Sequence, residues 1–147
     1  AAALGKSPLG LFDPSGDAQL RGEIEALLYP LGIPVWISDE HLMDAVTALA
    51  GSGPAFVYRF IDALTKAGEA LGLEPAVSST LAKAMIDGAV DLAVGSDASA
   101  EELARRVTSP GGTTAAGLAV LDTGLQQLVN DTLKAARDRG VELSKPN

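Results

Sequence analysis

The residues whose types and spacing best suit a chemical role lie in one short stretch, residues 107–114, which reads Val-Thr-Ser-Pro-Gly-Gly-Thr-Thr. Glycine permits a positive φ and a close approach of backbone to ligand, and proline fixes one dihedral angle. Thr113 and Thr114 are predicted to open a helix, where unpaired N–H groups can hold a carboxylate or a phosphate. The alternative is an ordinary connector between two helices, and the turn alone does not decide between them.

Other possible sites are weaker. The segment 51–54, Gly-Ser-Gly-Pro, follows a predicted helix and lacks the third glycine of a dinucleotide-binding fingerprint. The 107–114 turn lacks the lysine of a phosphate-binding loop. His41 stands between acidic neighbours and is interpreted as a surface residue. Arg105 and Arg106 precede the turn and could either attract a carboxylate ligand or complement the end of their own helix.

The composition excludes several classes of chemistry. The 147 residues contain no cysteine and one histidine, which removes disulfides, thiolate nucleophiles and histidine-rich metal sites, so no metal site is predicted. The net charge of −8 disfavours nucleic acid and anionic membranes as partners. No apolar run is long enough for a membrane span and no signal peptide is recognised, so a cytoplasmic protein is predicted.

The first 38 residues have the pattern of an α/β sheet. A weak strand over residues 4–12 is followed by turn residues at 13–17, by a helix with apolar residues at helical spacing, and by a β-branched and aromatic strand at 33–37. One strand-helix-strand unit cannot cover both faces of its strands. We therefore interpret residues 1–38 as the C-terminal remnant of a Rossmann-like domain whose remainder lies upstream.

From residue 39 onward the pattern is helical only. Asp39 is predicted to cap a first helix, and Ser52 to cap a second after a break at residues 51–54. Helices ending at Gly72, starting at Glu74 and capped by Ser99 follow. A short helix then comes after the 107–114 turn, and the last helix covers about five turns from residue 125. The predicted fold class is mainly α: a bundle of about six helices over 39–147, preceded by the strand-helix-strand remnant.

The helix that starts at Glu74 is predicted to bury one face. That face contains Val77, Leu81, Ala84, Met85, Gly88, Ala89 and Leu92. Gly88 costs about 1 kcal/mol of helix propensity relative to alanine, so a neighbouring helix is expected too close for a side chain. Because the chain is rich in alanine and poor in aromatic residues, each side chain buries little area, and an oligomer is expected.

Two motifs carry a resemblance to a known family. Residues 44–56, Asp-Ala-Val-Thr-Ala-Leu-Ala-Gly-Ser-Gly-Pro-Ala-Phe, are followed about fifty residues later by the 107–114 turn. In this order, with helices of suitable length between and after them, the motifs resemble the C-terminal helical domain of pyrroline-5-carboxylate reductase. The resemblance covers residues 39–145. Ala50 and Phe56 stand where many members have serine and tyrosine, so any polar role at these positions is absent.

The resemblance implies reduction of 1-pyrroline-5-carboxylate to L-proline by NADPH or NADH, so the cofactor would be NADP or NAD. It also implies an enzyme that dimerises through its helical domain. It implies a substrate-binding and catalytic role for Thr114. It assigns further substrate contacts to Ser109, Gly111, Gly112, Thr113, Thr47 and Ser52. Val107 would border the nicotinamide. The main cofactor site would lie in an N-terminal domain that this sequence does not include, so the chain is expected to be inactive alone.

Two other functions remain open at this stage. The chain could be a stand-alone helical dimerisation module in which the turn has only a structural role. It could also belong to a related reductase of another cyclic imine, because hydroxyls and backbone N–H groups recognise a carboxylate more sharply than a ring. The choice between NADH and NADPH and any assembly above the dimer are not determined by these residues.

Overall fold

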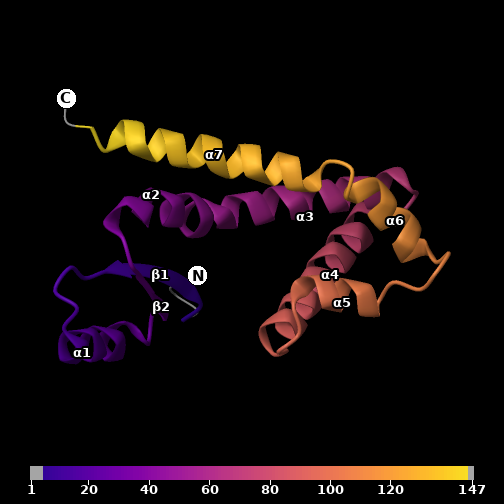
Figure 1. Cartoon of the computed structure of the whole chain (residues 1–147). Helices are drawn as coiled ribbons and strands as arrows, with labels where there is room; N and C mark the ends of the chain where they lie inside the picture. Colours follow the sequence, from indigo (N-terminus) through magenta and orange to yellow (C-terminus); the bar gives the residue numbers. More distant parts are fainter. Residues whose placement is uncertain (1–4, 146–147) are drawn as a thin grey trace. The chain divides into compact units, whose positions relative to one another are not determined.

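The computed structural model describes residues 5–145 and confirms the mainly helical class, with two strands near the N-terminus (Figure 1). Residues 1–4, including Leu4 of the predicted first strand, and residues 146–147 lie outside the described residues. The chain forms two compact units. The first comprises Ala1–Pro54 and Asn130–Asn147, as far as they are described, and the second comprises Ala55–Val129. The predicted domain boundary after residue 38 stays a prediction.

The N-terminal motif has the predicted strand-helix-strand order. Strand β1 (Ser7–Phe12) pairs in parallel with β2 (Gly32–Ile37), in a register that runs from Ser7 opposite Gly32 to Phe12 opposite Ile37. Helix α1 (Ala18–Leu28) connects the strands. It begins at Asp17, whose carboxylate accepts hydrogen bonds from the N–H groups of Gln19 and Leu20 at 2.9 and 3.2 Å. The turn chemistry of residues 13–17 therefore starts the helix, as predicted.

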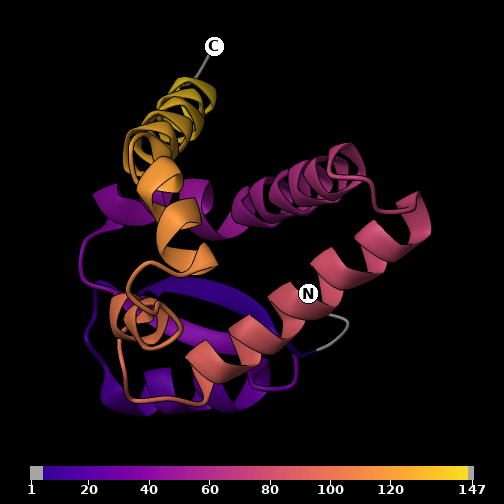
Figure 2. The same cartoon turned by 90° about the vertical axis from the view of Figure 1, so that its right-hand side faces the viewer.

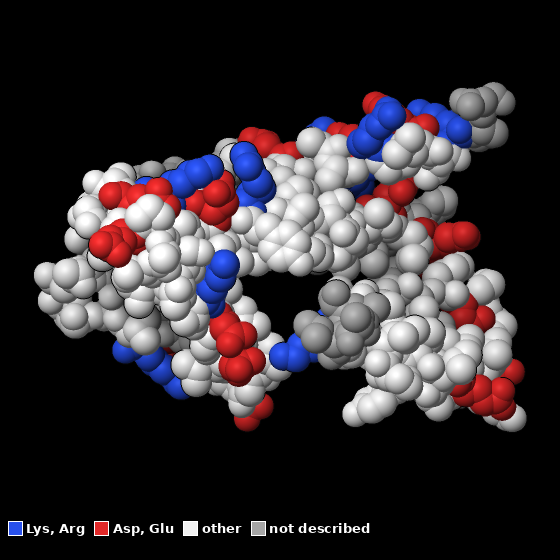
Figure 3. All heavy atoms as spheres, turned by 180° about the vertical axis from the view of Figure 1, so that it is seen from behind, with Lys and Arg blue, Asp and Glu red and all other residues white. Residues whose placement is uncertain are grey.

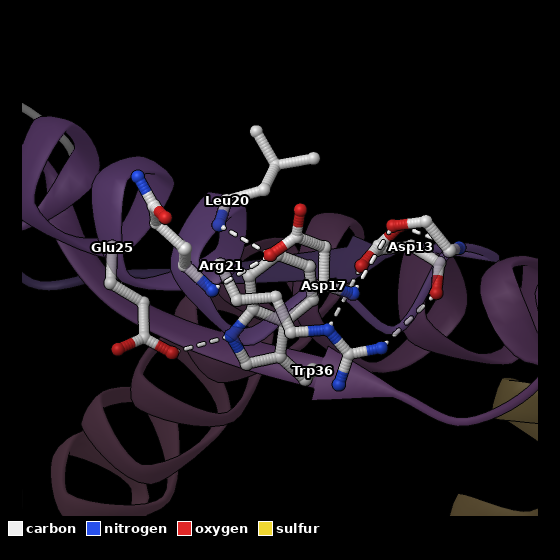
Figure 4. Close-up of polar contacts among 8 residues, drawn as sticks. Asp13, Asp17, Leu20, Arg21, Glu25 and Trp36 are labelled. Atoms are coloured by element: carbon white, nitrogen blue, oxygen red, sulfur yellow. Dashed lines mark hydrogen bonds and ion pairs between the residues drawn. The ribbon is translucent and has the colours of Figure 1, made fainter.

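A polar network ties α1 to strand β2 and to Asp13, the residue that follows β1 (Figure 4). Arg21 on α1 donates from Nε to the Asp13 carboxylate and from a terminal nitrogen to the Asp13 carbonyl, both at 3.1 Å. Its guanidinium carbon lies 4.8 Å from the ring centroid of Trp36 on β2, a cation–π distance. The Trp36 indole N–H in turn donates to Glu25. Every member of this network comes from residues 13–36, so the motif satisfies its own polar side chains.

A π-helical turn replaces the predicted break at residues 51–54. The chain runs through η2 (Glu40–Leu42), α2 (Met43–Val46) and η3 (Thr47–Gly51) into α3 (Gly53–Ala70). Asp39 caps η2 as predicted, accepting from His41 N–H at 2.9 Å. Ser52 directly precedes α3, the position of the predicted N-cap, but its own backbone is helical (φ −86°, ψ −25°) and its N–H donates to the Thr47 carbonyl at 2.9 Å. One extra residue in the turn lets the helical path continue.

The core of the first unit forms where α2 and η3 meet strand β1 and helix α7 (Leu125–Leu143). Ala48 is only 3% exposed. A Cβ at Gly10 of β1 would lie 2.4 Å from Val46 Cγ1, so α2 approaches the strand at a position where only glycine fits. A Cβ at Gly140 of α7 would lie 3.0 Å from Asp44 Oδ1. Glycines on β1 and on α7 therefore allow both elements to pack closely against α2.

The second unit is built on the hairpin of α3 and α4 (Pro75–Val94), and Figure 2 shows the chain folding back between the two helices. Gly72 has φ +100° and ends α3 as predicted. Ser78 is 3% exposed and donates its hydroxyl to the Thr65 carbonyl at 2.7 Å. A Cβ at Gly68 would lie 2.2 Å from Ser78 Oγ. Gly68 and Ser78 thus close the hairpin, a contact that the sequence analysis did not identify.

The predicted buried face of α4 is exposed within this chain. Val77, Leu81, Met85 and Leu92 are 45, 54, 52 and 70% exposed, while the buried positions on α4 are Ser78 and Ala82. Among the described residues of the second unit, no atom lies within 4 Å of the position that a Cβ at Gly88 would occupy. Within the second unit as described, the predicted close helix is therefore not found at Gly88. Apolar periodicity identifies a face that avoids water, but it does not identify the molecule that covers it.

The remaining helices are short. Helix α5 (Ala100–Arg106) starts at Ser99, whose hydroxyl accepts from Glu102 N–H at 3.2 Å, which confirms the predicted N-cap. Helix α6 (Thr113–Leu121) follows the 107–114 turn. Among the described residues, no helix combines the length and apolar character that crossing a membrane requires.

Candidate functional site

The 107–114 turn has a defined backbone. The Gly112 N–H donates to the Ser109 carbonyl at 3.0 Å and closes the turn. Gly111 has φ +70°, a left-handed conformation that glycine permits, whereas Gly112 has φ −78°. Gly112 is constrained by space, because a Cβ there would lie 2.4 Å from Ser109 Oγ and 3.2 Å from the Ser109 carbonyl oxygen. The two glycines are therefore required for different reasons, one conformational and one steric.

The start of α6 is suited to an anion. Gly112 is the N-cap residue and, having no side chain, caps none of the first N–H groups of the helix. These groups have no partner within a helix and carry the positive end of the helix dipole. Thr113 and Thr114 are both exposed beside them. The turn thus offers backbone donors and hydroxyl groups together, which is the chemistry that holds a carboxylate.

The first two residues of the turn differ from the rest. Thr108 donates its hydroxyl to the Ala104 carbonyl at 2.6 Å, so this side chain extends the end of α5 and does not serve the turn. Val107 is 69% exposed and presents an apolar surface next to the polar turn. The flat face of a ring such as that of nicotinamide can pack on such a surface, but the assigned role of Val107 stays a prediction.

Arg105 and Arg106 share one carboxylate. Glu102 accepts from Arg105 Nε at 2.8 Å and from Arg106 Nε at 2.9 Å, and all three side chains lie on α5. These pairs lie in the last turn of the helix, where positive charge is favourable. Both arginines therefore stabilise the end of α5. Of the two roles predicted for them, the contacts favour this structural role over attraction of a ligand.

The other predicted substrate contacts, Thr47 and Ser52, lie at the two ends of the π-helical turn and are joined by the hydrogen bond from Ser52 N–H to Thr47 O. Thr47 is exposed and Ser52 is half-buried. The π-helical turn belongs to the first unit and the 107–114 turn to the second. The structure therefore groups the predicted site residues into two sets, and their meeting in one site stays a prediction.

A shallow groove of about 340 Å³ in the first unit was not identified from the sequence. Its lining consists of Ala45, Ala48, Leu49, Asn130, Leu133, Lys134 and Arg137. Lys134 and Arg137 both pair with Asp138, and these hydrogen bonds hold the pKa of the Asp138 carboxyl below its usual value. Figure 3 shows the charged side chains gathered over the C-terminal part of α7. The groove has an apolar floor with a charged edge and lies where α2 and η3 pack against α7.

Metal chemistry finds no support in the described residues: no group of three or more His, Cys, Asp or Glu side chains there could hold an ion. The described residues also provide no suitable binding site for the pyrophosphate of a dinucleotide. The β1–α1 turn is the position where a pyrophosphate could meet a helix N-terminus, but Asp17 already caps α1 and Asp13 lies beside it. Two carboxylates at this point would repel a pyrophosphate, so the described residues do not fit the cofactor's phosphates.

The helical domain with its strand-helix-strand lead and glycine-containing turn is typical of the dimerisation domain of a reductase. The family model described as pyrroline-5-carboxylate reductase dimerisation matches residues 40–143. The chain therefore belongs to the pyrroline-5-carboxylate reductase family.

Individual relatives agree with this family. The chain is 43% identical over 120 residues to pyrroline-5-carboxylate reductase of Pseudomonas aeruginosa, covering 81% of this chain and 44% of that protein. It is 38% identical over 148 residues to pyrroline-5-carboxylate reductase 2 of Bacillus subtilis, covering 99% and 52%.

Solved structures show the same fold. A pyrroline-5-carboxylate reductase from Coxiella burnetii matches with a TM-score of 0.92 at 34% identity, covering 98% of this chain and 54% of that one. The Plasmodium falciparum pyrroline carboxylate reductase with NADP bound matches with a TM-score of 0.78 at 29% identity, covering 92% and 53%. The chain spans about half the length of the relatives it matches.

Proposed function

We propose that this chain is the substrate-binding and dimerisation part of an enzyme that reduces 1-pyrroline-5-carboxylate to L-proline with NAD(P)H. The observation that carries the proposal is the 107–114 turn, in which Gly111 at φ +70° and the uncapped start of α6 present donors to an anion. The family match over residues 40–143 supports the choice of ligand, because the substrate of that family carries one carboxylate on a small ring.

In this proposal Ser109 and the N–H groups around Gly112 and Thr113 hold the substrate carboxylate. Thr114 lies near the ring nitrogen, and Thr47 and Ser52 are outer contacts of the pocket. Addition of hydride to a cyclic imine is easiest when the nitrogen is protonated, so these side chains have to bind and orient the ring. Correct orientation can contribute several kcal/mol to lowering the barrier. The reductant is held by a part of the enzyme outside this chain.

The protein is proposed to work as a homodimer. After Thr113 and Thr114, helix α6 contains only alanine, glycine, leucine and valine, yet Val120 is 74% and Leu121 40% exposed in the single chain. A helix that is apolar all round is normally buried in an assembly. The dimerisation description of the matched family supports the same partner.

The test uses a chimera in which the part of the Pseudomonas aeruginosa reductase that this chain does not match is fused to this chain. We expect oxidation of NAD(P)H that depends on pyrroline-5-carboxylate. A chimera that is folded, dimeric and able to bind NADP, but does not reduce the imine, would contradict the proposal. Dimerisation of the chain without any response to proline would favour a stand-alone dimerisation module.

The role of Thr114 is tested in the active chimera. Thr114→Ala is expected to lower kcat/KM by about tenfold or more, which corresponds to losing about 1.4 kcal/mol of transition-state stabilisation. The matched control is Thr123→Ala, whose hydroxyl donates to the Val120 carbonyl at the other end of α6. The control should keep kcat/KM within about twofold. An equally small effect of Thr114→Ala would remove this residue from the site.

A further inference from the structure

The π-helical turn η3 changes which residues share one face of the helical path. In an α-helix, residues five positions apart point about 140° away from each other, because successive residues turn by about 100°. Here the Ser52 N–H donates to the Thr47 carbonyl at 2.9 Å, which is the hydrogen bond of a π-helix between residues five apart. This bond stacks Ser52 on Thr47, so the two residues lie on the same face.

Packing fixes the direction of that face. Ala48, inside the turn, is 3% exposed and belongs to the core of the first unit, whereas Thr47 is exposed. A Cβ at Gly51 would lie 3.6 Å from Thr47 Cγ2, so the glycine leaves the Thr47 side chain uncovered. Ser52 is half-buried. Thr47 and Ser52 therefore form one small hydroxyl-bearing surface next to a buried alanine.

Pro54 supplies a reason in the sequence for this turn. In an unbroken α-helix, the ring of a proline clashes with the carbonyl four residues earlier and leaves that carbonyl without its hydrogen bond. For Pro54 that carbonyl belongs to Ala50, inside the π-helical turn. The backbone nevertheless stays helical at Ser52 (φ −86°, ψ −25°) and continues into α3. The wider turn thus lets the helical path pass the proline without a break.

We propose that Pro54 is a positioning residue that favours the π-helical turn and thereby holds Thr47 and Ser52 on one face, where both contact the same substrate ring. The inference rests on the proposed function, which gives both residues a substrate contact, and adds the residue that aligns them. A five-membered ring is small, so two side chains pointing about 140° apart on a helix could not both reach it. Pro54 acts through the backbone and does not touch the substrate.

The first test compares two proline variants of the active chimera. Pro54→Ala lets the turn close as an α-helix, so its crystal structure should show the Ser52 N–H bonded to the Ala48 carbonyl. Proline binding, measured by calorimetry, should weaken about fivefold, whereas the melting temperature should stay the same or rise, because alanine is the better helix former. Pro75→Ala is the matched control, since Pro75 also lies in the first turn of its helix but follows Glu74 in extended conformation. It should change the proline affinity by less than about twofold.

A double-variant comparison tests whether Pro54 acts through Ser52. Ser52→Ala alone should also weaken proline binding about fivefold, because one hydrogen bond to the ligand is lost. Adding Pro54→Ala to that variant should cause less than about a twofold further loss, since the hydroxyl that Pro54 positions is already gone. A residue with a merely structural role would instead lower the affinity by the same factor in both backgrounds.

Each opposite outcome overturns the inference in a distinct way. An unaltered chimera that does not bind proline contradicts the proposed function, and the inference falls with it. A Pro54→Ala variant that keeps the bond from Ser52 to Thr47 shows that the proline does not cause the turn. A variant that becomes α-helical there and binds proline as before shows that the shared face is not needed. Equal losses with and without Ser52, together with a lower melting temperature, leave Pro54 a structural role only.

Discussion

The β1–α1–β2 motif and the helices of the second unit differ in where their side chains find partners. In the motif, Arg21, Asp13, Trp36 and Glu25 satisfy one another across α1, β2 and the end of β1. In the second unit, apolar residues of α4 and α6 are exposed, and the start of α6 has no side-chain cap. The polar network of the motif is complete within one chain. The second unit presents surfaces and donors that suit another copy and a small anion, which is why the proposed functions concentrate there.

The largest expected effect is a loss of stability in the β1–α1–β2 motif. A Cβ at Gly32 would lie 1.9 Å from the Ser7 carbonyl oxygen and 2.6 Å from the Ser7 nitrogen, and both atoms belong to the paired backbone of β1. Backbone atoms in a strand pair cannot move aside as a flexible side chain can. Gly32→Ala should therefore destabilise the first unit by about 3 kcal/mol or more, measured by urea unfolding. Gly22→Ala, in open space on α1, is the control and should be neutral or slightly stabilising.

A smaller effect is expected at the closed end of the α3–α4 hairpin. Gly68→Ala would bring a methyl group to 2.2 Å from Ser78 Oγ and disturb the bond from Ser78 to the Thr65 carbonyl. The loss should be about 1–3 kcal/mol despite the gain in helix propensity. Adding Ser78→Ala removes the clashing oxygen, so the double variant should lose less than the sum of the single changes. Additive losses in thermal or urea unfolding would show that the two residues do not share this contact.

The smallest expected effect is a loss of stability at low pH in the first unit. Hydrogen bonds from the Ser15 hydroxyl and backbone N–H, with further help from Arg21, lower the pKa of Asp13 to about 2 from a usual value of 3.8. A carboxyl whose pKa is lower in the folded state stabilises the fold above the unfolded pKa and loses that contribution as the pH falls. Stability of the first unit should therefore fall between about pH 4 and pH 2.

The contribution of Asp13 is isolated by comparing Asp13→Asn with the unaltered chain. Thermal melting curves of both are recorded across the same pH range. The variant should be less stable at neutral pH and should lose less on acidification, because asparagine does not titrate. Asp62 on α3 provides a contrast. The pKa of Asp62 is also lowered, first by the hydrogen bond from Lys66, but Asp62 and Lys66 form an exposed ion pair between residues four positions apart on one helix. An identical pH response of Asp13→Asn and the unaltered chain would show that the Asp13 network does not stabilise the motif.

Local patterns predicted most of the elements because their causes are local. Asp17, Asp39 and Ser99 each accept a hydrogen bond from a backbone N–H two or three residues on, so neighbouring residues are enough to place those helix starts. The π-helical turn at Thr47–Gly51 was missed because glycine and proline usually interrupt a helix. Here Pro54 falls in the first turn of α3, where its missing N–H is not needed, and the helical path continues through Ser52.

The sequence by itself determined the mainly helical class, the strand-helix-strand lead and the position of the 107–114 turn at the start of a helix, because each depends on residues within a few positions of one another. Tertiary structure decided which glycines make close contacts. Gly10 and Gly140 meet side chains from distant parts of the chain and Gly68 meets Ser78 across the α3–α4 hairpin, whereas no described atom of its unit comes within 4 Å of a Cβ at Gly88. Apolar periodicity predicted that one face of α4 is buried, but Val77, Leu81 and Met85 on that face are exposed in the described chain. The physical reason is that burial depends on what approaches a helix from outside, and a residue pattern describes only the helix.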